Sequence, residues 1–343
     1  MKRLLIFLFI ITYSVVNAQQ ISNDVIERIA FGSCNSQDRP QEIWYKIIDQ
    51  KPQLFIFLGD NIYGDTEDMD ILKKKYDQLL EKPGYIELKK NTKVLATWDD
   101  HDYGVNDGGK EYPKKVESKE LFLKVFDEPV VSERRNHAGI YTSYLYGPKG
   151  KRLQVIMLDT RTFRDSLCWA GKDEDCIGEY GKCTDTSKTM LGKEQWKWLE
   201  AQLKVEADLR IIGTSTQLLQ DFNGWEGWIN MPHERERMIK LIAKTKANGV
   251  CFISGDVHYG EMSVLKRKGL YPIYDITSSG LTHGHSCAGP NILRVGGCYM
   301  QPNFGMITIN WEAKNGPQIT FELRDAKGDV KLKQETSGKQ LSF

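Results

Sequence analysis

The chain has 343 residues, of which 40% are hydrophobic and 27% are charged. This balance is typical of a folded globular protein and excludes a chain that is disordered over most of its length. The formal net charge of +1 at pH 7 gives no overall signal for a nucleic acid or an anionic membrane, so any attraction for an anion has to be local.

The N-terminus has the pattern of a secretory signal peptide. Lys2 and Arg3 precede an apolar run over residues 4–16, and Ala18 is a small residue at a suitable cleavage position. The run is shorter than the roughly 20 residues of a membrane-spanning helix, and no later stretch is long enough either. We therefore expect a signal peptide over residues 1–18, export to the periplasm or beyond, no transmembrane segment, and one catalytic domain over residues 19–343.

Short apolar runs alternate with helical patterns and predict an α/β domain with a largely buried sheet. The expected strands are residues 28–31, 54–58, 94–97, 153–158, 209–212 and 250–253. The expected helices are residues 40–50, 69–80, 118–126, 192–205 and 232–248. Near the end the pattern changes to successive strands over 306–311, 318–323 and 330–333, which we expect to be antiparallel, at a sheet edge or in a second sheet.

Seven cysteines would lie in a compartment that permits disulfides. Cys168, Cys176 and Cys183 occur in a polar, glycine-rich insert, and Cys287 and Cys298 flank another irregular segment. We expect one disulfide between two of the first three cysteines and a second disulfide between Cys287 and Cys298.

The two remaining cysteines have different settings. Cys251 lies within an apolar strand and is expected in the core, whereas Cys34 directly follows the first strand in a Gly-Ser-Cys-Asn turn. The odd number of cysteines makes Cys34 the first candidate for a thiol with a function.

Polar side chains follow five of the predicted strands at the point where each strand ends. These segments are residues 32–35 (GSCN), 59–63 (GDNIY), 98–102 (WDDHD), 159–161 (DTR) and 254–258 (SGDVH). In α/β sheets, ligands bind in the crevice beyond the carboxyl ends of the strands. We therefore expect these side chains to meet at one edge of the sheet.

The residue types in these segments suit metal ions. Clustered carboxylates repel one another unless a cation is present, and carboxylate and imidazole ligands together can hold two ions. Such a pair clamps the attacking and leaving oxygens of a displacement at phosphorus and activates a water molecule. Gly59 and Gly255 would permit a tight turn and a close backbone approach there. The sequence therefore predicts a metal site for phosphoric-ester hydrolysis.

Simpler interpretations exist for each residue alone. A single aspartate after a strand is more often a helix cap, a lone His101 is more often structural, and Arg161 or Arg164 would usually form surface ion pairs. The recurrence of acid and histidine at three strand ends favours a joint site. The sequence has no Gly-x-Ser-x-Gly, phosphate-loop, His-Glu-x-x-His or Gly-x-Gly-x-x-Gly motif.

In this order, the motifs resemble those of the PhoD-like phosphatases, the alkaline phosphatase D family of metallophosphoesterases, over about residues 29–311. The resemblance implies a four-layer α/β/β/α sandwich and phosphomonoesterase or phosphodiesterase activity. It also implies Fe³⁺ together with Ca²⁺ as cofactors, with other divalent metals as alternatives. The chain departs from the family pattern at Gly64, where the family often has an acid and this chain has Asp65 one step later, and in the insert from Cys168 to Cys183.

The resemblance also implies roles for individual residues. Asp60 would bridge the metals, Cys34 and Tyr63 would bind iron, and the Asp-Asp-His motif would lie at the site or directly behind it. The expected metal ligands are Cys34, Asp60, Tyr63, Asp100, Asn106, Asp256 and His258. The expected catalytic residues are Asp60, His101, Arg161 and His258, and the expected substrate-binding residues are Asn106 and Arg161.

The leading hypothesis is an exported hydrolase in which a metal-activated hydroxide attacks the phosphorus of a small-molecule or lipid phosphoric ester. The alternative is an exported metal- or ligand-binding protein of the same fold that has lost catalysis. The presence of Asp60, Asp256 and His258 favours the enzyme. Trp169, Trp225 and Trp228 are either pocket-lining residues or packing residues, and no pattern specifies an oligomeric state.

Overall fold

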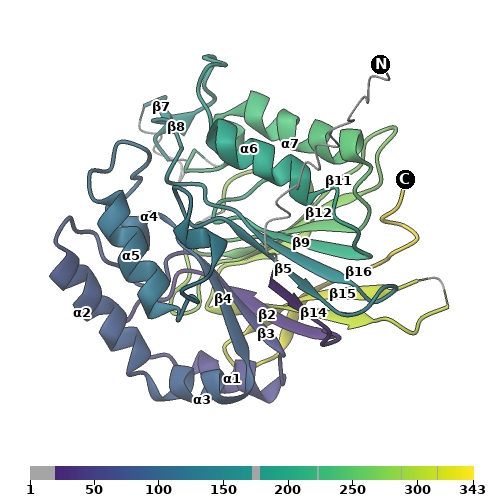
Figure 1. The fold of residues 1–343 in the computed structure, drawn as a ribbon, viewed down its shortest axis with the longest axis horizontal. Helices are drawn as coiled ribbons and strands as arrows, with labels where there is room; N and C mark the ends of the chain where they lie inside the picture. The colour runs from purple at the N-terminus through teal and green to yellow at the C-terminus, as the bar shows by residue number, and fades with distance from the viewer. Residues whose placement is uncertain (1–19, 172–177, 222–223, 287, 315) are drawn as a thin grey trace, which may run out of the picture.

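Two β-sheets lie face to face at the centre of the protein, with helices on both outer faces (Figure 1). The structure, a computed structural model, describes residues 20–171, 178–221, 224–286, 288–314 and 316–343. The predicted signal peptide, Cys176 and Cys287 therefore lie outside the described residues, and the Cys287–Cys298 disulfide remains a prediction. Among the described residues, no helix is both long enough and apolar enough to cross a lipid bilayer.

The first sheet has six strands in the order β16-β15-β14-β2-β3-β4. Its parallel half contains β2 (Arg28–Gly32), β3 (Leu54–Leu58) and β4 (Lys93–Thr97). Its antiparallel half contains β14 (Asn303–Asn310), β15 (Gln318–Asp325) and β16 (Val330–Ser337). The C-terminal strands therefore extend one edge of the parallel sheet, which confirms their predicted antiparallel arrangement.

The second sheet has eight strands in the order β1-β5-β6-β9-β10-β12-β11-β13. Three of its strands were predicted, namely β6 (Leu153–Met157), β9 (Leu209–Gly213) and β10 (Val250–Ser254). Five were missed, namely β1 (Gln20–Ser22), β5 (Thr142–Tyr146), β11 (Gly260–Leu265), β12 (Ile273–Ser278) and β13 (Arg294–Tyr299). Polar residues interrupt their apolar runs; in β12, for example, the fully buried Asp275 accepts hydrogen bonds from Ser254 and from two backbone amides.

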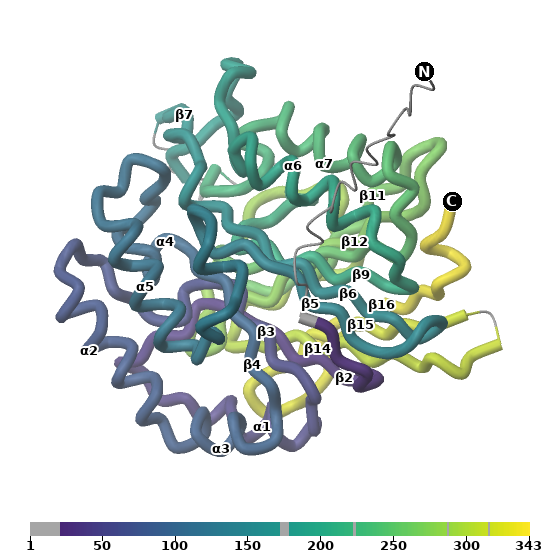
Figure 2. Tube along the Cα trace, in the orientation of Figure 1, coloured from purple at the N-terminus to yellow at the C-terminus, as the bar shows by residue number. Residues whose placement is uncertain are grey.

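Helices cover the outer face of each sheet (Figure 2). The helices beside the six-stranded sheet are α1 (Ile43–Asp49), α2 (Met69–Leu80), α3 (Pro83–Asn91) and α5 (Lys115–Val125), with the short α4 (Asp100–Tyr103) at its edge. The helices beside the eight-stranded sheet are α6 (Gly192–Gln202) and α7 (Pro232–Thr245). Short 3₁₀ helices span Glu133–Arg135 and Trp228–Asn230, and β7 (Cys168–Trp169) pairs with β8 (Tyr180–Gly181). The predicted four-layer α/β/β/α order is confirmed.

Strand β3 shows how the core is divided between the layers. Leu54, Ile56 and Leu58 belong to the hydrophobic cluster between the two sheets, whereas Phe55 and Phe57 pack against the helices on the other side. All five residues are buried because both faces of the strand are covered. Such a strand appears in a sequence as a continuous apolar run, which made it predictable.

The two sheets are joined where the parallel strands end. Ser33, after β2, forms a β-bridge with Ser279, after β12, and its backbone N–H donates to the carbonyl of Ser278 at 3.1 Å. Thr97 at the end of β4 donates to the carbonyl of Leu158, after β6, at 2.7 Å. The carboxyl ends of strands from both sheets therefore meet at one edge, where the predicted polar segments lie.

Candidate metal centre and active site

Strained backbone marks the loops that carry the predicted ligands. Cys34, Asp60, Asp256 and His258 all have left-handed φ angles, of 59°, 48°, 75° and 57°. For a residue other than glycine, this conformation costs roughly 1–2 kcal/mol. Four such residues at one edge of the sheets indicate that the surrounding structure holds them in place for a function.

Two glycines permit close backbone approach here, as predicted, but for different reasons. Gly59 has a φ of 102°, and a Cβ atom there would lie 2.4 Å from the Cβ atom of Asp99. A Cβ atom on Gly255 would lie 2.3 Å from Oγ of Ser33. Gly59 is therefore required both by its backbone angle and by the lack of room for a side chain. Gly255 is required by the lack of room alone.

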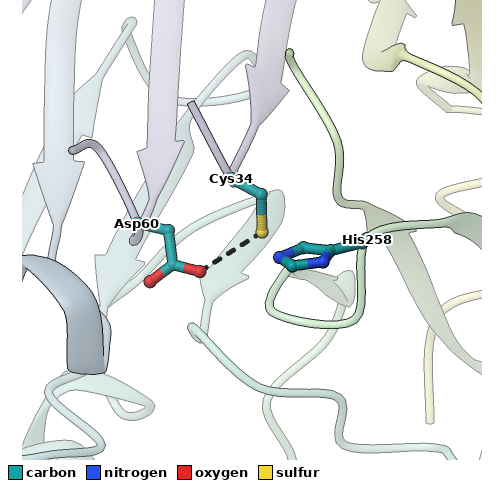
Figure 3. A group of neighbouring side chains, drawn as sticks. All are labelled: Cys34, Asp60 and His258. Carbon is teal, nitrogen blue, oxygen red and sulfur yellow. Dashed lines mark hydrogen bonds between the residues drawn. The ribbon is translucent and has the colours of Figure 1, made fainter. Parts of the chain in front are cut away.

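The Cys34 thiol lies between groups from three loops (Figure 3). Its Sγ atom is 3.3 Å from Oδ2 of Asp60 and 3.0 Å from Oγ of Ser279. Oγ of Ser279 also accepts a hydrogen bond of 2.7 Å from the backbone N–H of His258. Ligand atoms of Cys34, Asp60 and His258 lie within 4.8 Å of one another, so these three side chains form a potential metal-binding group.

Four carboxylates lie beside this group. Ligand atoms of Asp60, Asp99, Asp100 and Asp256 are all within 4.8 Å of one another. Burial, followed by the negative charges of Cys34 and of Asp100 and Asp99, raises the pKa of Asp60 well above its ordinary value. Burial raises the pKa of Asp256 likewise, and the neighbouring carboxylates add to the shift.

The donor atoms of this cluster fit bound cations. The Oδ1 atom of Asp60 is buried and accepts no hydrogen bond from any described residue. A buried carboxylate oxygen without a partner is unfavourable in the metal-free protein, and metal coordination satisfies such a group. Carboxylate oxygens, a thiol and imidazoles together form a ligand set for di- or trivalent ions.

Tyr63 points into the site and not into the hydrophobic core. Its hydroxyl group is 2.9 Å from Nε2 of His258 and 3.3 Å from Nε2 of His283. Burial, together with negative charges at Cys34 and Asp60, raises the pKa of Tyr63. Burial and neighbouring cations lower the pKa values of both histidines to about 4, so both imidazoles are neutral at pH 7, the form that binds metals.

His101 is charged, unlike these two histidines. Its Nδ1 atom is 2.6 Å from Oδ1 of Asp65, and its Nε2 atom is 4.0 Å from Oδ2 of Asp100. Burial opposes the charge, but the hydrogen bond to Asp65 and the negative charges of Asp100 and Asp65 together outweigh burial and raise the pKa of His101 to about 9. Asp65, the acid one step beyond the usual family position, therefore holds a cationic histidine at the site.

Arg161 lies behind the carboxylates. The guanidinium group is fully buried, donates to Oδ1 of Asp99 at 2.5 Å, and forms an ion pair with Glu226. It also lies 3.6 Å from Oδ1 of Asp100. Burial raises the pKa of Asp100, but Arg161, His101 and backbone hydrogen bonds together outweigh burial and lower this pKa to about 2. Direct contact between Arg161 and phosphate therefore stays a prediction, whereas its contact with three acids is a feature of the fold.

A pocket of about 200 Å³ opens over the cluster. Its lining residues are Asp100, His101, Asn106, Asp107, Trp225, Glu226, Asp256, Val257, His258, Tyr259, His285 and Gly289. Asn106 is exposed there, and Trp225 is the one predicted tryptophan that borders it, since Trp228 is buried and Trp169 lies elsewhere on the surface. A cavity of about 390 Å³, lined partly by Lys93, His137 and Tyr141, is larger but contains none of the clustered acids.

Several residues of the site were not predicted from the sequence. Asp99 was the first acid of the Asp-Asp-His motif, so a signal for it was present. Glu226, His283 and His285 lie in loops without a preceding predicted strand, and no local pattern marks them. Tertiary structure alone brings them to the pocket.

Comparison with known proteins agrees with this geometry. The model of the PhoD-like phosphatase family matches residues 29–285, which is most of the chain. The chain belongs to the PhoD-like phosphatase family. Alkaline phosphatase D of Bacillus subtilis (strain 168) is 28% identical over 188 residues, which are 48% of this chain and 30% of the relative. The match thus spans less than a third of that relative's length.

Solved structures show the same fold at lower identity. The structure of PhoD has a TM-score of 0.70 at 17% identity, covering 93% of this chain and 71% of that one. A dimetal phosphatase from Danio rerio has a TM-score of 0.55 at 12% identity, over 92% of this chain and 99% of the other. GAP50, described as the anchor in the inner membrane complex of Plasmodium, has a TM-score of 0.58 at 12% identity, over 92% of this chain and 89% of the other.

Proposed function

We propose that this chain is an exported, metal-dependent hydrolase of phosphoric esters. The observation that carries the proposal is the group of four carboxylates, Asp60, Asp99, Asp100 and Asp256, which converge beneath a pocket. Family membership and the likeness to alkaline phosphatase D support it. Export rests on the signal-peptide pattern of residues 1–18.

Asp60 would belong to two sets of metal ligands. Cys34, Tyr63 and His258 would hold Fe³⁺, since thiolate, phenolate and imidazole are good donors to this ion. Asp100, Asn106 and Asp256 would supply oxygen ligands to Ca²⁺ or another divalent ion. When bound, the ions would supply positive charge to the phosphoryl oxygens and lower the pKa of a water nucleophile.

The chain's own side chains would orient and protonate the substrate. His101, charged through its contact with Asp65, would donate a hydrogen bond or a proton to the leaving oxygen. Arg161 would help to keep Asp100 ionised, and its ion pairs would hold Asp99 and Asp100 in position from behind. The resulting positions of donors and acceptors would favour the transition state over the bound substrate.

The size of the pocket limits the substrate. About 200 Å³ accommodates a phosphoryl group and the first part of a leaving group, so we infer a small-molecule or lipid ester whose remainder extends past Trp225. The exposed indole offers an apolar surface to an organic leaving group.

A turnover assay on purified protein tests the proposal. An aryl phosphate and a bis-aryl phosphate are each assayed after chelation and after addition of Fe³⁺ with Ca²⁺, or of other divalent metals singly. We expect chelation to abolish turnover and one metal addition to restore it. Metal binding without turnover on either substrate would instead support the binding protein without catalysis.

A further inference from the structure

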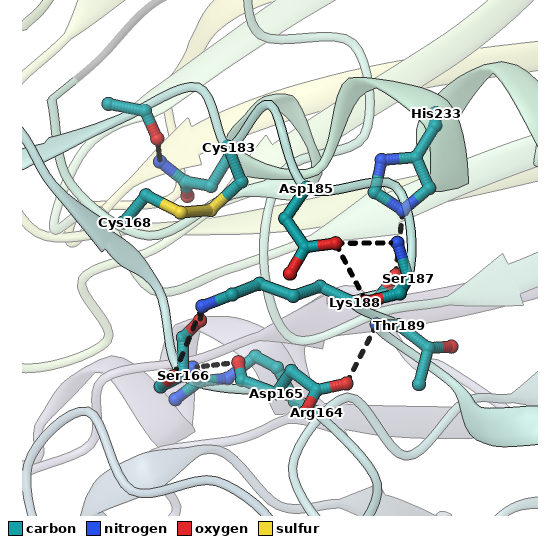
Figure 4. Close-up of a disulfide and its surroundings, with 12 residues drawn as sticks. Arg164, Asp165, Ser166, Cys168, Cys183, Asp185, Ser187, Lys188, Thr189 and His233 are labelled. Carbon is teal, nitrogen blue, oxygen red and sulfur yellow. Dashed lines mark hydrogen bonds between the residues drawn. A yellow bond between two sulfur atoms is a disulfide. The ribbon is translucent and has the colours of Figure 1, made fainter.

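An insert between β6 and α6 reaches from a fixed base to the rim of the pocket. At its base, Asp165 and Thr189 exchange two hydrogen bonds, of 3.0 and 2.9 Å, and Nζ of Lys188 donates to Oγ of Ser166 at 3.1 Å (Figure 4). Further along the insert, a disulfide joins Cys168 to Cys183, which confirms the bridge predicted for this insert. The base is therefore held independently of the disulfide.

Beyond the disulfide, the paired strands β7 and β8 present Tyr180 to the pocket. The hydroxyl group of Tyr180 donates a 2.6 Å hydrogen bond to Oδ2 of Asp107, which lines the pocket. The backbone N–H of the same residue donates to the carbonyl of Gly224 at 2.7 Å, directly before Trp225. One residue of the insert thus contacts two separate segments of the pocket wall.

Asp107 in turn orients the residues around it. Its φ of 56° is left-handed, which an aspartate adopts only at a cost. Its backbone N–H donates to Oδ2 of Asp100 at 2.8 Å, and its carbonyl accepts a hydrogen bond from Arg164. Asn106, the exposed residue predicted to contact the substrate, is its immediate neighbour.

We propose that Tyr180, presented by the disulfide-closed insert, is a positioning residue that fixes the Asn106–Asp107 turn over the pocket and so sets how tightly substrate is held. The proposal rests on the phosphoesterase function proposed for this pocket. Hydrogen bonds to a carboxylate are among the strongest in proteins, and a turn held in advance loses less entropy when substrate binds. The disulfide keeps β8 in register and thereby limits the motion of Tyr180.

Replacement of one hydroxyl group tests the proposal. In Tyr180→Phe we expect kcat/KM to fall about tenfold, mostly through a higher KM, with the melting temperature unchanged. Asp107→Asn keeps an oxygen acceptor but loses the charge that strengthens this hydrogen bond, so it should cause a smaller loss of the same kind. Tyr180→Phe should then have less effect in the Asp107→Asn background than in wild type, because both changes weaken one contact. Tyr45→Phe, which changes an exposed tyrosine on α1, is the matched control and should retain wild-type constants.

The disulfide is tested separately. Cys168→Ser/Cys183→Ser should raise KM in the same direction, and Tyr180→Phe should add little in that background. Wild-type KM in Tyr180→Phe, or effects of the two changes that simply add, would overturn the proposal.

Hydrogen exchange distinguishes this inference from the function on which it rests. Absence of turnover by the wild-type protein with every metal would refute the proposed function. The rate of amide hydrogen exchange in peptides covering residues 103–112 then tests the positioning role of Tyr180 without any assay of activity. Faster exchange in Tyr180→Phe than in wild type and in Tyr45→Phe supports the positioning role, and equal exchange in all three proteins refutes it.

Discussion

Asp60 combines three properties that are costly in a side chain without a ligand. It is buried, its backbone is left-handed, and one of its carboxylate oxygens accepts no hydrogen bond from the described residues. The negative charges of neighbouring carboxylates further disfavour the ionised form of Asp60. Each property is explained if Asp60 is held in place to bridge cations, because a bridging carboxylate has to reach both ions at once.

Asp60→Asn should lower turnover by about three orders of magnitude while the protein remains folded. Asparagine also tolerates the left-handed conformation, but it removes the negative charge that would hold the cations, and without a bound metal the water nucleophile would keep its high pKa. Steady-state kinetics and the circular dichroism of the variant check both parts. Near-wild-type turnover of a folded Asp60→Asn protein would remove Asp60 from the centre of the mechanism.

Cys34 and Tyr63 test the identity of the metal. If thiolate and phenolate bind Fe³⁺, the purified protein is coloured by charge transfer; Tyr63→Phe should then shift or bleach the band and Cys34→Ala should lower the iron content. Absorption spectra and metal analysis measure both effects. Cys251→Ala is the matched control, because Cys251 is buried in β10 away from the site, and it should retain iron and colour. An active, colourless protein that contains only zinc or calcium would contradict the iron assignment.

At the scale of elements, the helices depend on local capping that is separate from the site. Oδ1 of Asp68 accepts hydrogen bonds from the backbone N–H groups of Asp70, at 2.9 Å, and of Ile71, at 3.3 Å. These groups have no partner within the helix, so the side chain satisfies them at the N-terminus of α2.

Asp68→Ala should lower the free energy of unfolding by about 1 kcal/mol and leave kcat/KM unchanged. Denaturant titration and the turnover assay measure the two quantities. Asp77→Ala, within the same helix, breaks only an exposed ion pair with Lys73 and should change stability by a few tenths of a kcal/mol. Equal losses of stability in the two variants would show that the cap contributes no more than the exposed ion pair.

At the scale of the whole molecule, the buried acids link stability to pH and to metal. Burial raises the pKa values of Asp99 and Asp102 to about 8, partly offset by Arg161 at Asp99 and by backbone hydrogen bonds at Asp102, while the unfolded chain titrates near 3.9. The folded, metal-free protein therefore binds more protons than the unfolded chain up to about pH 8. His101, with a pKa raised to about 9, acts in the same direction above pH 6.5.

The metal-free protein should become less stable as pH rises from 6.5 to 8. In this window the unfolded chain has already lost the protons that the folded acids retain, so the free energy of unfolding falls with pH. His258 and His283, whose pKa values are lowered to about 4 in the folded protein, titrate near 6.5 in the unfolded chain, so they oppose the trend in part at pH 6.5 and no longer do so at pH 8.

Melting temperatures in chelator between pH 6.5 and 8 measure this slope. Metal addition at pH 8 should raise the melting temperature, because cations replace the missing protons. Asp99→Asn should show a shallower slope in chelator than wild type. A melting temperature that rises with pH in the metal-free protein would contradict the account.

Strands that are buried on both faces, and the motifs that follow them, could be predicted from local sequence patterns. A strand such as β3 has a local apolar pattern, and Asp60 and Asp256 follow such strands directly, so their meeting at one edge could be predicted from the α/β pattern. The bridge within the insert could be predicted from the clustering of three cysteines in an irregular segment, although which two of them pair could not.

The partners of these residues depend on contacts between segments that are far apart in the sequence. Cys34 contacts Ser279 from 245 positions away, and Tyr63 contacts His283 from 220 positions away, across two different sheets. Arg161 is enclosed by acids because the loops after β4 and β6 pack together, although its sequence position alone suggested an exposed phosphate contact. The spacing of apolar residues indicates which face of a helix or strand is buried. The contacts of Cys34, Tyr63 and Arg161 depend instead on how the two sheets pack together, which no local sequence pattern specifies.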